Sequence, residues 1–422
     1  MQRAGKPNPL TSVVRRRMAN IMLKDSRRLM LIFTMACCGL IAQVRELSAQ
    51  EWTQTTAPSN NWTGLASSAD GSKLVASSSN GGIYSSPDSG KTWTRATNAP
   101  YPVNWVSVAS SADGTKLIAA ENNSTYTAGA IYTSGDSGAT WTTNLVPAIA
   151  WTSVSSSGNG EVLVAGVATG NPVYFSTNSG ATWVAANLPS HDRSYVSVSA
   201  DGKQLAVAFQ VGHIYTSTNL GATWITNTSP VLGYSALASS ADGRKLVAGT
   251  RDLGGSTYPG AIYTSADAGA TWRSNSVPQH SWASFAITPG GSKIVAGTSG
   301  GGAVYISTKG TWTTNTIAGG IASIGPVAMS ADGNVLVAAG VKAGSIWILR
   351  TTPTPVMDIT QINGTFTLSW IVPSTNFIVQ CSSDLWNWQD LTDTPALNLS
   401  SLQEQLSVSP SGSNSFFRLK TP

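Results

Sequence analysis

Apolar and polar residues alternate along most of the chain after residue 60. Short runs with an apolar residue at every second position, such as residues 105–110 and 116–120, are separated by polar segments that contain glycine. A period of two residues predicts strands that bury one face. No stretch after residue 50 shows the period of 3.6 residues that an amphipathic helix requires. The pattern therefore predicts an all-β chain.

A turn signal follows the first strand of each repeat. Asp-Gly and Asn-Gly are strong hairpin signals, because a type I′ turn needs a positive φ at both central residues. Gly290-Gly291 fills the same slot in one repeat. The repeats are about 40–48 residues long. The other turns are Asp70-Gly71, Asp113-Gly114, Asn159-Gly160, Asp201-Gly202, Asp242-Gly243 and Asp332-Gly333.

A second turn recurs as Ser-x-Asp-x-Gly-x-Thr-Trp, first at residues 86–93. An Asp or Asn side chain can accept hydrogen bonds from backbone N–H groups further along the turn. The glycine can take a positive φ, and the indole can cover the base of the hairpin. We therefore assign these residues structural roles. The copies pair Asp88 with Trp93, Asp136 with Trp141, Asn178 with Trp183, Asn219 with Trp224 and Asp267 with Trp272, and a shortened copy ends at Trp312.

Each repeat is predicted to contain four antiparallel strands, which is the pattern of a β-propeller blade. Seven first strands indicate seven blades within residues 50–350. The seventh repeat ends at Arg350 without a fourth strand, and residues 51–58 resemble a fourth strand without a repeat. Pairing the two would close the ring and remove an open sheet edge. We therefore predict closure by the N-terminal strand.

A Pro-rich linker at residues 351–355 separates the repeats from residues 356–422. Residues 365–370, 377–382 and 416–419 are predicted strands. Residues 380–385 with Trp388, and the ending at 416–419, resemble a short C-terminal module of secreted bacterial proteins. The resemblance implies a small immunoglobulin-like or fibronectin-like β-sandwich.

The charge distribution argues against a nucleic-acid partner. The formal net charge is +5, but residues 1–50 hold nine basic and two acidic residues, which leaves 16 basic and 18 acidic residues in the rest. Charged residues make up only 11% of the chain, against about 25% in an ordinary soluble protein. The body is therefore near neutral, without the basic patch that nucleic-acid binding needs.

Residues 1–49 are predicted to be a signal peptide. Arg27 and Arg28 precede an apolar run at residues 29–42, which is shorter than the roughly 20 residues that span a bilayer. Ala49 ends a plausible cleavage site, while Met18 or Met22 as the true start, lipidation at Cys37 and an uncleaved anchor remain alternatives. We expect an exported protein, extracellular, periplasmic or at the cell surface, with no transmembrane span in the mature chain. Only Cys381 would remain after cleavage, so no internal disulfide is expected.

The motif at residues 86–93 resembles the Asp-box, or BNR repeat, of sialidase-like β-propellers. The whole array is similar to the seven-bladed Asp-box family that includes photosystem II assembly factors, which bind proteins. The resemblance implies that the boxes lie away from the active face. Sialidases use three arginines, a Tyr–Glu nucleophile, an Asp acid/base and an Arg-Ile-Pro signature in six blades. The signature is missing and the blade count differs, so we do not expect a sialidase.

The face that carries the blade connections and the loops between second and third strands is the predicted ligand face. Two of these loops are long, residues 121–129 with Tyr126 and 251–260 with Tyr258, although drift in a tolerant position is an equal alternative. The residue eight places before each Asp-Gly turn is usually aromatic, and such faces suit sugars or peptides. We favour the alternative that these side chains are wedges between blades, which leaves one arginine unexplained. The set is Trp62, Trp105, Trp151, Arg193, Tyr234, Trp282 and Ile324.

Catalytic chemistry has few candidates. A glycosidase needs two carboxylates about 5–10 Å apart, and Glu121, Asp192 and Asp252 come from three different blades. His191, His213 and His280 lack metal-ligand spacing, so neither a metal nor a cofactor is predicted. We predict an exported, non-enzymatic binding or scaffold protein, expected to be a monomer, with a glycan or an extracytoplasmic protein as partner. The alternative is a polysaccharide-active glycoside hydrolase or lyase.

Overall fold

The described part of the chain is all β. The computed structural model describes residues 51–123, 125, 127–168, 170, 172–189, 193–251, 260–317, 323–351, 357–362, 365–371, 378–383, 387–398, 402–408 and 416–420. The predicted signal peptide and most of the predicted linker lie outside these residues. Within them, no helix has the length and apolar character needed to cross a membrane.

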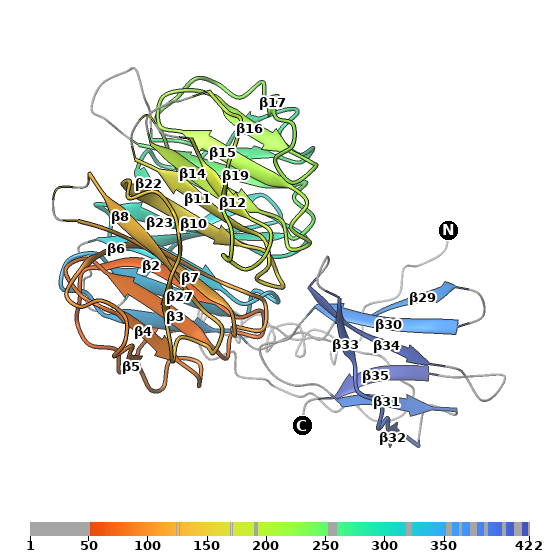
Figure 1. Ribbon diagram of the computed structural model, residues 1–422. Helices are drawn as coiled ribbons and strands as arrows, with labels where there is room; N and C mark the ends of the chain where they lie inside the picture. Colours follow the sequence, from red (N-terminus) through yellow and green to blue (C-terminus); the bar gives the residue numbers. More distant parts are fainter. Residues whose placement is uncertain are drawn as a thin grey trace, which may run out of the picture. The chain divides into compact units, whose positions relative to one another are not determined.

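Antiparallel sheets of four sequential strands, here called blades, succeed one another along the chain (Figure 1). Each Asp-Gly hairpin joins the first two strands of a blade. Each Ser-x-Asp-x-Gly-x-Thr-Trp turn, here called an Asp-box turn after the motif that it resembles, joins the last two. The first five blades are separate sheets. Their strands are β2 (Trp62–Ser67), β3 (Leu74–Ser78), β4 (Ile83–Ser86), β5 (Thr94–Arg95); β6 (Asn104–Ser110), β7 (Leu117–Asn122), β8 (Gly129–Ser134), β9 (Thr142–Thr143); β10 (Trp151–Ser156), β11 (Leu163–Val167), β12 (Tyr174–Ser176), β13 (Val184–Ala185); β14 (Ser194–Val198), β15 (Leu205–Phe209), β16 (Ile214–Ser217), β17 (Ile225–Thr226); and β18 (Tyr234–Ser239), β19 (Leu246–Thr250), β20 (Ile262–Ser265), β21 (Arg273–Ser274).

The last two blades are joined into one eight-stranded sheet through the single pair Thr298↔Ile324. The seventh blade takes its fourth strand from the start of the chain, because Thr53 pairs with Ile348 and Gln54 with Trp347. The prediction of closure by the N-terminal strand is confirmed, and the described strands form seven blades. The strands of these two blades are β22 (Ser281–Ile287), β23 (Lys293–Ser299), β24 (Ala303–Thr308), β25 (Thr311–Thr316), β26 (Ile324–Met329), β27 (Val335–Gly340), β28 (Ile346–Arg350) and β1 (Thr53–Gln54).

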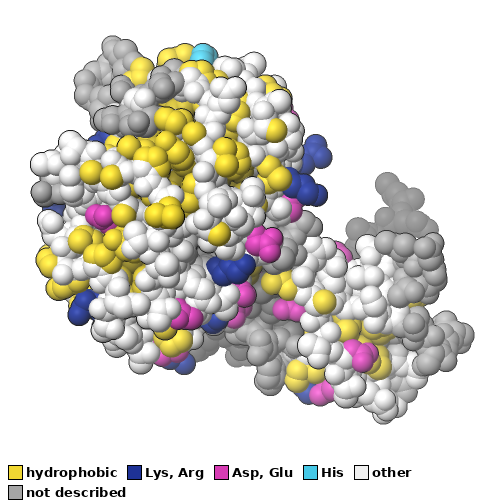
Figure 2. Space-filling view, in the orientation of Figure 1, with side chains coloured by type: hydrophobic (Ala, Val, Ile, Leu, Met, Phe, Trp, Pro, Cys, Tyr) yellow, Lys and Arg dark blue, Asp and Glu magenta, His cyan; other side chains and the backbone are white. Residues whose placement is uncertain are grey.

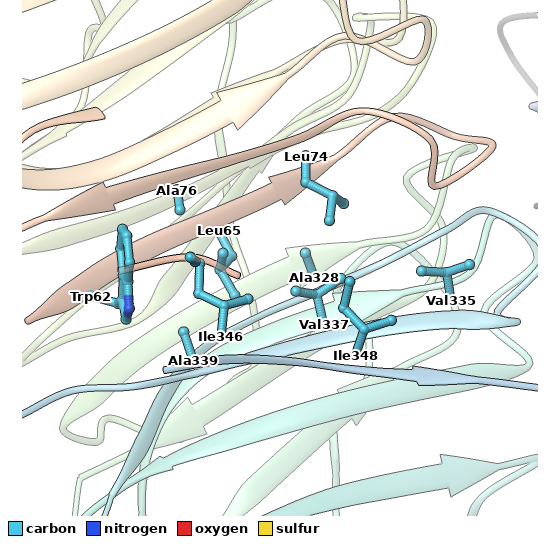
Figure 3. Close-up of a cluster of buried hydrophobic side chains, with 11 residues drawn as sticks. Trp62, Leu65, Leu74, Ala76, Ala328, Val335, Val337, Ala339, Ile346 and Ile348 are labelled. Carbon is cyan, nitrogen blue, oxygen red and sulfur yellow. The ribbon is translucent and has the colours of Figure 1, made fainter. Parts of the chain in front are cut away.

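Buried apolar clusters fill the interfaces between successive blades. There are seven of them in the described residues, one for each pair of neighbours, including the seventh blade and the first. Figure 3 shows the closing cluster, in which Trp62 and Leu65 from β2 lie with Val337 and Ala339 from β27 and Ile346 from β28. Since this cluster resembles the others, packing as well as strand pairing closes the ring.

Backbone hydrogen bonds join the Asp-Gly turns of neighbouring blades. The Ala69 amide donates to the Ala112 carbonyl at 2.7 Å, and the Ala331 amide donates to the Ala69 carbonyl at 2.7 Å. The same bond links the turns from the second blade to the sixth. The equivalent bond from the sixth blade to the seventh cannot form, because the donor position is Pro289, which has no N–H group. These bonds hold the channel end opposite the blade connections at a fixed width.

The Asp-box turns show how one side chain closes a hairpin. The Asp88 carboxylate accepts hydrogen bonds from the Thr92 amide at 2.8 Å and the Thr92 hydroxyl at 2.6 Å. Ser86 Oγ accepts from the Gly90 amide at 2.8 Å, and the left-handed φ of 84° at Gly90 suits glycine. The hydrogen bonds from Thr92 lower the pKa of Asp88 to about 2.

Asparagine fills the same role in two blades by reversing one hydrogen bond. Asn178 Oδ1 accepts from the Thr182 amide at 2.9 Å, and Asn178 Nδ2 donates to the Thr182 hydroxyl at 2.8 Å. Asn219 and Thr223 have the same arrangement. The threonine hydroxyl can donate to a carboxylate or accept from an amide. This explains why either Asp or Asn can occupy this position.

The C-terminal residues form a two-sheet β-sandwich. One sheet has the order β29-β30-β34-β33 and the other β32-β31-β35. Leu368, Trp370 and Leu406 of the first sheet share a buried core with Val379 of the second. The strands are β29 (Asp358–Ile362), β30 (Thr365–Ile371), β31 (Ile378–Ser382), β32 (Gln389–Asp390), β33 (Ala396–Asn398), β34 (Gln403–Val408) and β35 (Phe416–Lys420).

We predict that Thr55→Pro destabilises the ring. The Thr55 amide donates to the Ile346 carbonyl at 2.9 Å, and proline removes that donor. Leaving the carbonyl unpaired costs about 1–3 kcal/mol, which a lower urea midpoint would report. Thr55→Ala keeps the amide and is the matched control. Equal midpoints for the two variants would contradict a stabilising role for the closing strand.

The Asp-box carboxylates predict a stability loss in acid. The pKa of Asp88 and that of Asp267 are each lowered to about 2, and the pKa of Asp136 is also lowered, mainly by hydrogen bonds from the box threonines. Groups with a lowered folded-state pKa stabilise the protein at neutral pH and lose that contribution as the pH falls from about 4 towards 2. A triple Asp→Asn variant at these positions should lose less stability over that range.

Urea denaturation at several pH values between 7 and 2 measures this effect. The control is the triple variant Glu51→Gln, Asp358→Asn and Asp393→Asn, which removes the same charge from exposed positions outside the turns. At neutral pH the Asp-box variant should have a urea midpoint close to that of the wild type, because asparagine already makes the same turn in two blades. An unchanged acid slope in the Asp-box variant would argue against the assignment.

Candidate functional site

A cavity of about 550 Å³ lies where the innermost strands begin. All seven blades line it, with Trp62, Val106, Trp151, Tyr195 and Ser235 from the first five. The sixth blade contributes Ser281, Trp282, Ala283, Ser284 and Ser299, and the seventh Gly325, Pro326 and Val341. We call this cavity the channel mouth. Its volume falls within the roughly 300–1,000 Å³ of small-molecule sites.

The repeated aromatic residues are wedges between blades. Trp62, Trp105, Trp151, Tyr234 and Trp282 are each at most 1% exposed. In four blades the indole ring meets a tyrosine on the third strand of the same blade edge-on, with centroids 5.2–5.8 Å apart; these are Trp62, Trp105, Trp151 and Trp282. Interblade packing covers these rings, which supports the wedge interpretation that we favour over stacking on a sugar or peptide.

Three of these aromatic residues also donate hydrogen bonds to loop carbonyls, whereas Trp105 Nε1 and Trp151 Nε1 are buried without a partner among the described residues. Trp62 Nε1 donates to the Gly344 carbonyl at 2.8 Å, and Trp282 Nε1 donates to the Gly260 carbonyl at 3.0 Å. The Tyr234 hydroxyl donates to the Pro230 carbonyl at 2.7 Å, and burial raises its pKa. These contacts tie the ligand-face loops to the ring.

Arg193 does not occupy the aromatic position, contrary to the alignment by turn spacing. In six of the seven blades, the hairpin of the first two strands contains a β-bulge directly after the repeated aromatic residue or its isoleucine equivalent, as between Trp62 and Gly64. The fourth blade has a regular register, in which Ser194 pairs with Phe209. Without the extra bulge residue, Ser194 takes the place of the tryptophan, and Arg193 lies one residue further out, at the channel mouth.

Phe209 supplies the missing wedge from the second strand. Its side chain is 1% exposed, and its ring meets Tyr215 edge-on at 5.6 Å and 79°. The corresponding pair in the third blade is Trp151 and Tyr174, at 5.8 Å and 75°. A large aromatic residue at the end of the second strand, where the other blades have Ser, Asn, Val, Thr or Gly, is the sequence signal for this exchange.

Two guanidinium groups give the channel mouth its charge. Arg193 and Arg251 both line the cavity and are half-buried, and Arg251 Nη2 donates to the Tyr195 hydroxyl at 3.2 Å. No described carboxylate lines the cavity. Charged side chains are few and scattered on the face of the described residues that Figure 2 shows. The ion pair found among the described residues joins Lys420 and Asp390, which both belong to the sandwich. Sequence analysis did not select Arg251 or Tyr195, since only the fold brings them beside Arg193.

The hydroxyl groups of the channel mouth already donate hydrogen bonds between blades. Thr63 Oγ1 donates to the Trp105 carbonyl at 2.8 Å, and Ser235 Oγ donates to the Trp282 carbonyl at 2.7 Å. Ser284 Oγ donates to the Gly325 carbonyl at 2.9 Å. Because a hydroxyl has one proton and two lone pairs, these side chains can offer a ligand mainly acceptors.

Glu121 is the one catalytic candidate that lies within the described residues. Glu121, on β7, pairs with Trp105 and Ala130 in the strand register and is not among the residues that line the cavity. Burial raises the pKa of Glu121. The remaining described carboxylates of the seven blades lie in the turns at the opposite end or in the N-terminal strand segment. Four predicted candidates lie outside the described residues: Asp192, Asp252, Tyr126 and Tyr258.

Histidines are engaged singly in the described structure. His213 Nδ1 lies 3.0 Å from the Ser229 carbonyl, and His280 Nε2 lies 2.6 Å from the Tyr305 hydroxyl. No group of three or more His, Cys, Asp or Glu side chains that could hold a metal ion occurs in the described residues.

Comparisons with known proteins support the propeller architecture. No protein-family model matches the chain, and no curated protein matches it. Its fold is similar to the GH74 xyloglucanase from Xanthomonas campestris, with a TM-score of 0.56 and 16% identity over 76% of this chain and 60% of that chain. The fold is also similar to the GH74 enzyme from Niastella koreensis, with a TM-score of 0.55 and 15% identity over 88% of this chain and 74% of that chain.

A binding protein has a similar fold as well. YCF48, solved with a D1 peptide, gives a TM-score of 0.52 and 17% identity over 72% of this chain and 99% of that chain. At these identities the similarity shows the fold alone, and the chain spans only 60% of the length of the Xanthomonas enzyme. Fold and comparisons together define the class: this is an all-β propeller protein.

The register of the fourth blade makes a direct prediction. Phe209→Ala should destabilise the protein by about 3–5 kcal/mol, because it empties an interblade wedge. Arg193→Ala should change stability by no more than about 0.5 kcal/mol, as for other surface positions. Urea denaturation of both variants tests the assignment. A larger loss for Arg193→Ala than for Phe209→Ala would restore the alignment by turn spacing.

Proposed function

We propose that this chain is an exported, non-enzymatic binding protein, and that its channel mouth binds a glycan or an extracytoplasmic protein. The observation that carries the proposal is the cavity of about 550 Å³ to which all seven blades contribute. It combines two guanidinium groups with hydroxyl acceptors, and no described carboxylate lines it. Such a site can hold a polar ligand but has no described acid and base pair for hydrolysis.

The repeated turn also supports membership of the Asp-box propeller superfamily. Asp88, Asp136 and Asp267 make the same hydrogen bonds to the threonine four residues later. We propose that the chain is a seven-bladed Asp-box propeller, for which proteins of similar fold include both glycoside hydrolases and a peptide-bound protein. Export follows from the apolar N-terminal run preceded by Arg27 and Arg28.

One observation favours the alternative of a polysaccharide-active hydrolase or lyase. Burial raises the pKa of the half-buried Glu121, and a raised pKa is a property of catalytic general acids. A second carboxylate is still required. A hydrolysis and lyase screen of the purified protein on a panel of neutral and acidic polysaccharides tests this reading. Turnover that Glu121→Gln or Asp252→Asn abolishes would replace binding by catalysis as the function.

We predict that Ala283→Trp abolishes ligand binding. Ala283 lines the channel mouth, and a tryptophan there would fill much of the space that a ligand needs. Screening the protein on a glycan array and against an extracytoplasmic protein fraction identifies ligands, and calorimetry with each of them measures the loss. The control is Ala266→Trp, an exposed position in an Asp-box turn at the other end of the blades. Binding that survives Ala283→Trp would place the ligand elsewhere.

A further inference from the structure

We infer that the channel mouth recognises an acidic glycan, and that Arg193 and Arg251 bind the carboxylate of a uronate residue. This inference rests on the proposed function and specifies its ligand. Both guanidinium groups line the same cavity. They belong to the fourth and fifth blades, so one sector of the channel mouth is cationic, and the other described side chains that line it are uncharged.

The donors that remain for a ligand point to an anion. Thr63, Ser235 and Ser284 have their hydroxyl protons in bonds to carbonyls of the neighbouring blade. Asn122 uses its amide in the same way, donating to the Trp151 carbonyl at 2.8 Å and accepting from the Trp151 amide at 2.7 Å. Among the described lining side chains, the guanidinium groups are therefore the charged donors, and they match oxyanions best. The hydroxyls of Tyr195 and Ser299 are neutral donors in the same cavity.

The fold positions the Arg251 guanidinium. The Tyr195 hydroxyl accepts its Nη2–H at 3.2 Å, and Tyr195, two residues from Arg193, lines the same cavity. A half-buried position strengthens charge interactions relative to bulk water. A planar guanidinium with five N–H groups can hold a carboxylate through two hydrogen bonds while one further N–H remains on Tyr195.

The acceptors that line the same cavity favour a sugar over a peptide. The hydroxyl oxygens of Thr63, Ser235 and Ser284 retain lone pairs, and a sugar ring carries several O–H donors around its edge. A peptide offers one backbone N–H for each residue. Since the cavity is a mouth bounded by all seven blades rather than a groove along one sheet, it suits the end or a side branch of a glycan.

Calorimetry with defined probes tests the inference. Trigalacturonate should bind the full-length protein, and its methyl ester, which has the same sugars without the charge, should bind at least about tenfold more weakly. Arg193→Gln and Arg251→Gln should each weaken trigalacturonate binding on the order of 10- to 100-fold, as expected for a lost charged hydrogen bond. Raising the salt concentration should weaken binding in the wild type more than in either variant.

Arg273→Gln is the matched control. Arg273 is exposed on β21, an outer strand, and does not line the channel mouth. Its substitution removes the same charge, so trigalacturonate binding should stay within about twofold of the wild type, since exposed and distant charges are screened. A loss equal to that of Arg193→Gln would mean that net charge rather than the site governs binding, and would overturn the inference.

Three results would overturn this inference, and the Ala283→Trp variant then shows whether the proposed function fails with it. Equal binding of trigalacturonate and its ester, or binding that neither arginine affects, overturns the acidic-glycan assignment. Arginine-dependent binding of triglutamate that is tighter than that of trigalacturonate also overturns it, and identifies an acidic peptide as the occupant. In both cases a ligand blocked by Ala283→Trp leaves the channel mouth as the binding site, whereas no ligand blocked by it removes the proposed function too.

Discussion

The packing of each blade against the next is the interaction on which the whole structure depends. A single four-stranded sheet of this size buries one face poorly, so its stability comes from its neighbours. Here a large side chain enters each interface at the start of the inner strand. Tryptophan does this in four interfaces, tyrosine in one, isoleucine in one, and Phe209, from the second strand, in the remaining one. Because the seventh interface matches the others, the ring has no free apolar face.

Hydrogen bonds join neighbouring blades around the channel at both of its ends. At one end, the backbone amides of the Asp-Gly turns donate to carbonyls of the next blade. At the other end, hydroxyl groups such as those of Thr63 and Ser235 donate across the same interfaces. Small polar residues therefore line the channel because they must join adjacent strands in little space. Their engagement limits what the channel mouth can offer to a ligand.

The proposed binding site lies where the fourth blade departs from the repeat. The fourth blade lacks the β-bulge of the other six, and the loss of one residue moves Arg193 out of the interface and into the channel mouth. Ser194 and Phe209 compensate for the missing tryptophan. Arg251, which follows the second strand of the neighbouring blade, lines the same cavity and donates to the Tyr195 hydroxyl. A repeated residue serves the fold in this protein, and the departures from repetition supply the charged groups.

Much of the architecture was decided by the sequence itself, because local chemistry encodes it. Asp-Gly pairs and Asp-box turns set the hairpins through positive φ and short-range hydrogen bonds, their period sets the number of blades, and the missing fourth strand after Arg350 required residues near Thr53 to close the ring. Tertiary structure alone decided the site. The constant distance to the Asp-Gly turn aligned Arg193 with the tryptophans. A β-bulge depends on how two strands pair, so its absence from the fourth blade could not be read from the sequence of one strand. Burial of Trp151, the exchange with Phe209 and the meeting of Arg251 with Tyr195 all arise between blades, where distant segments pack.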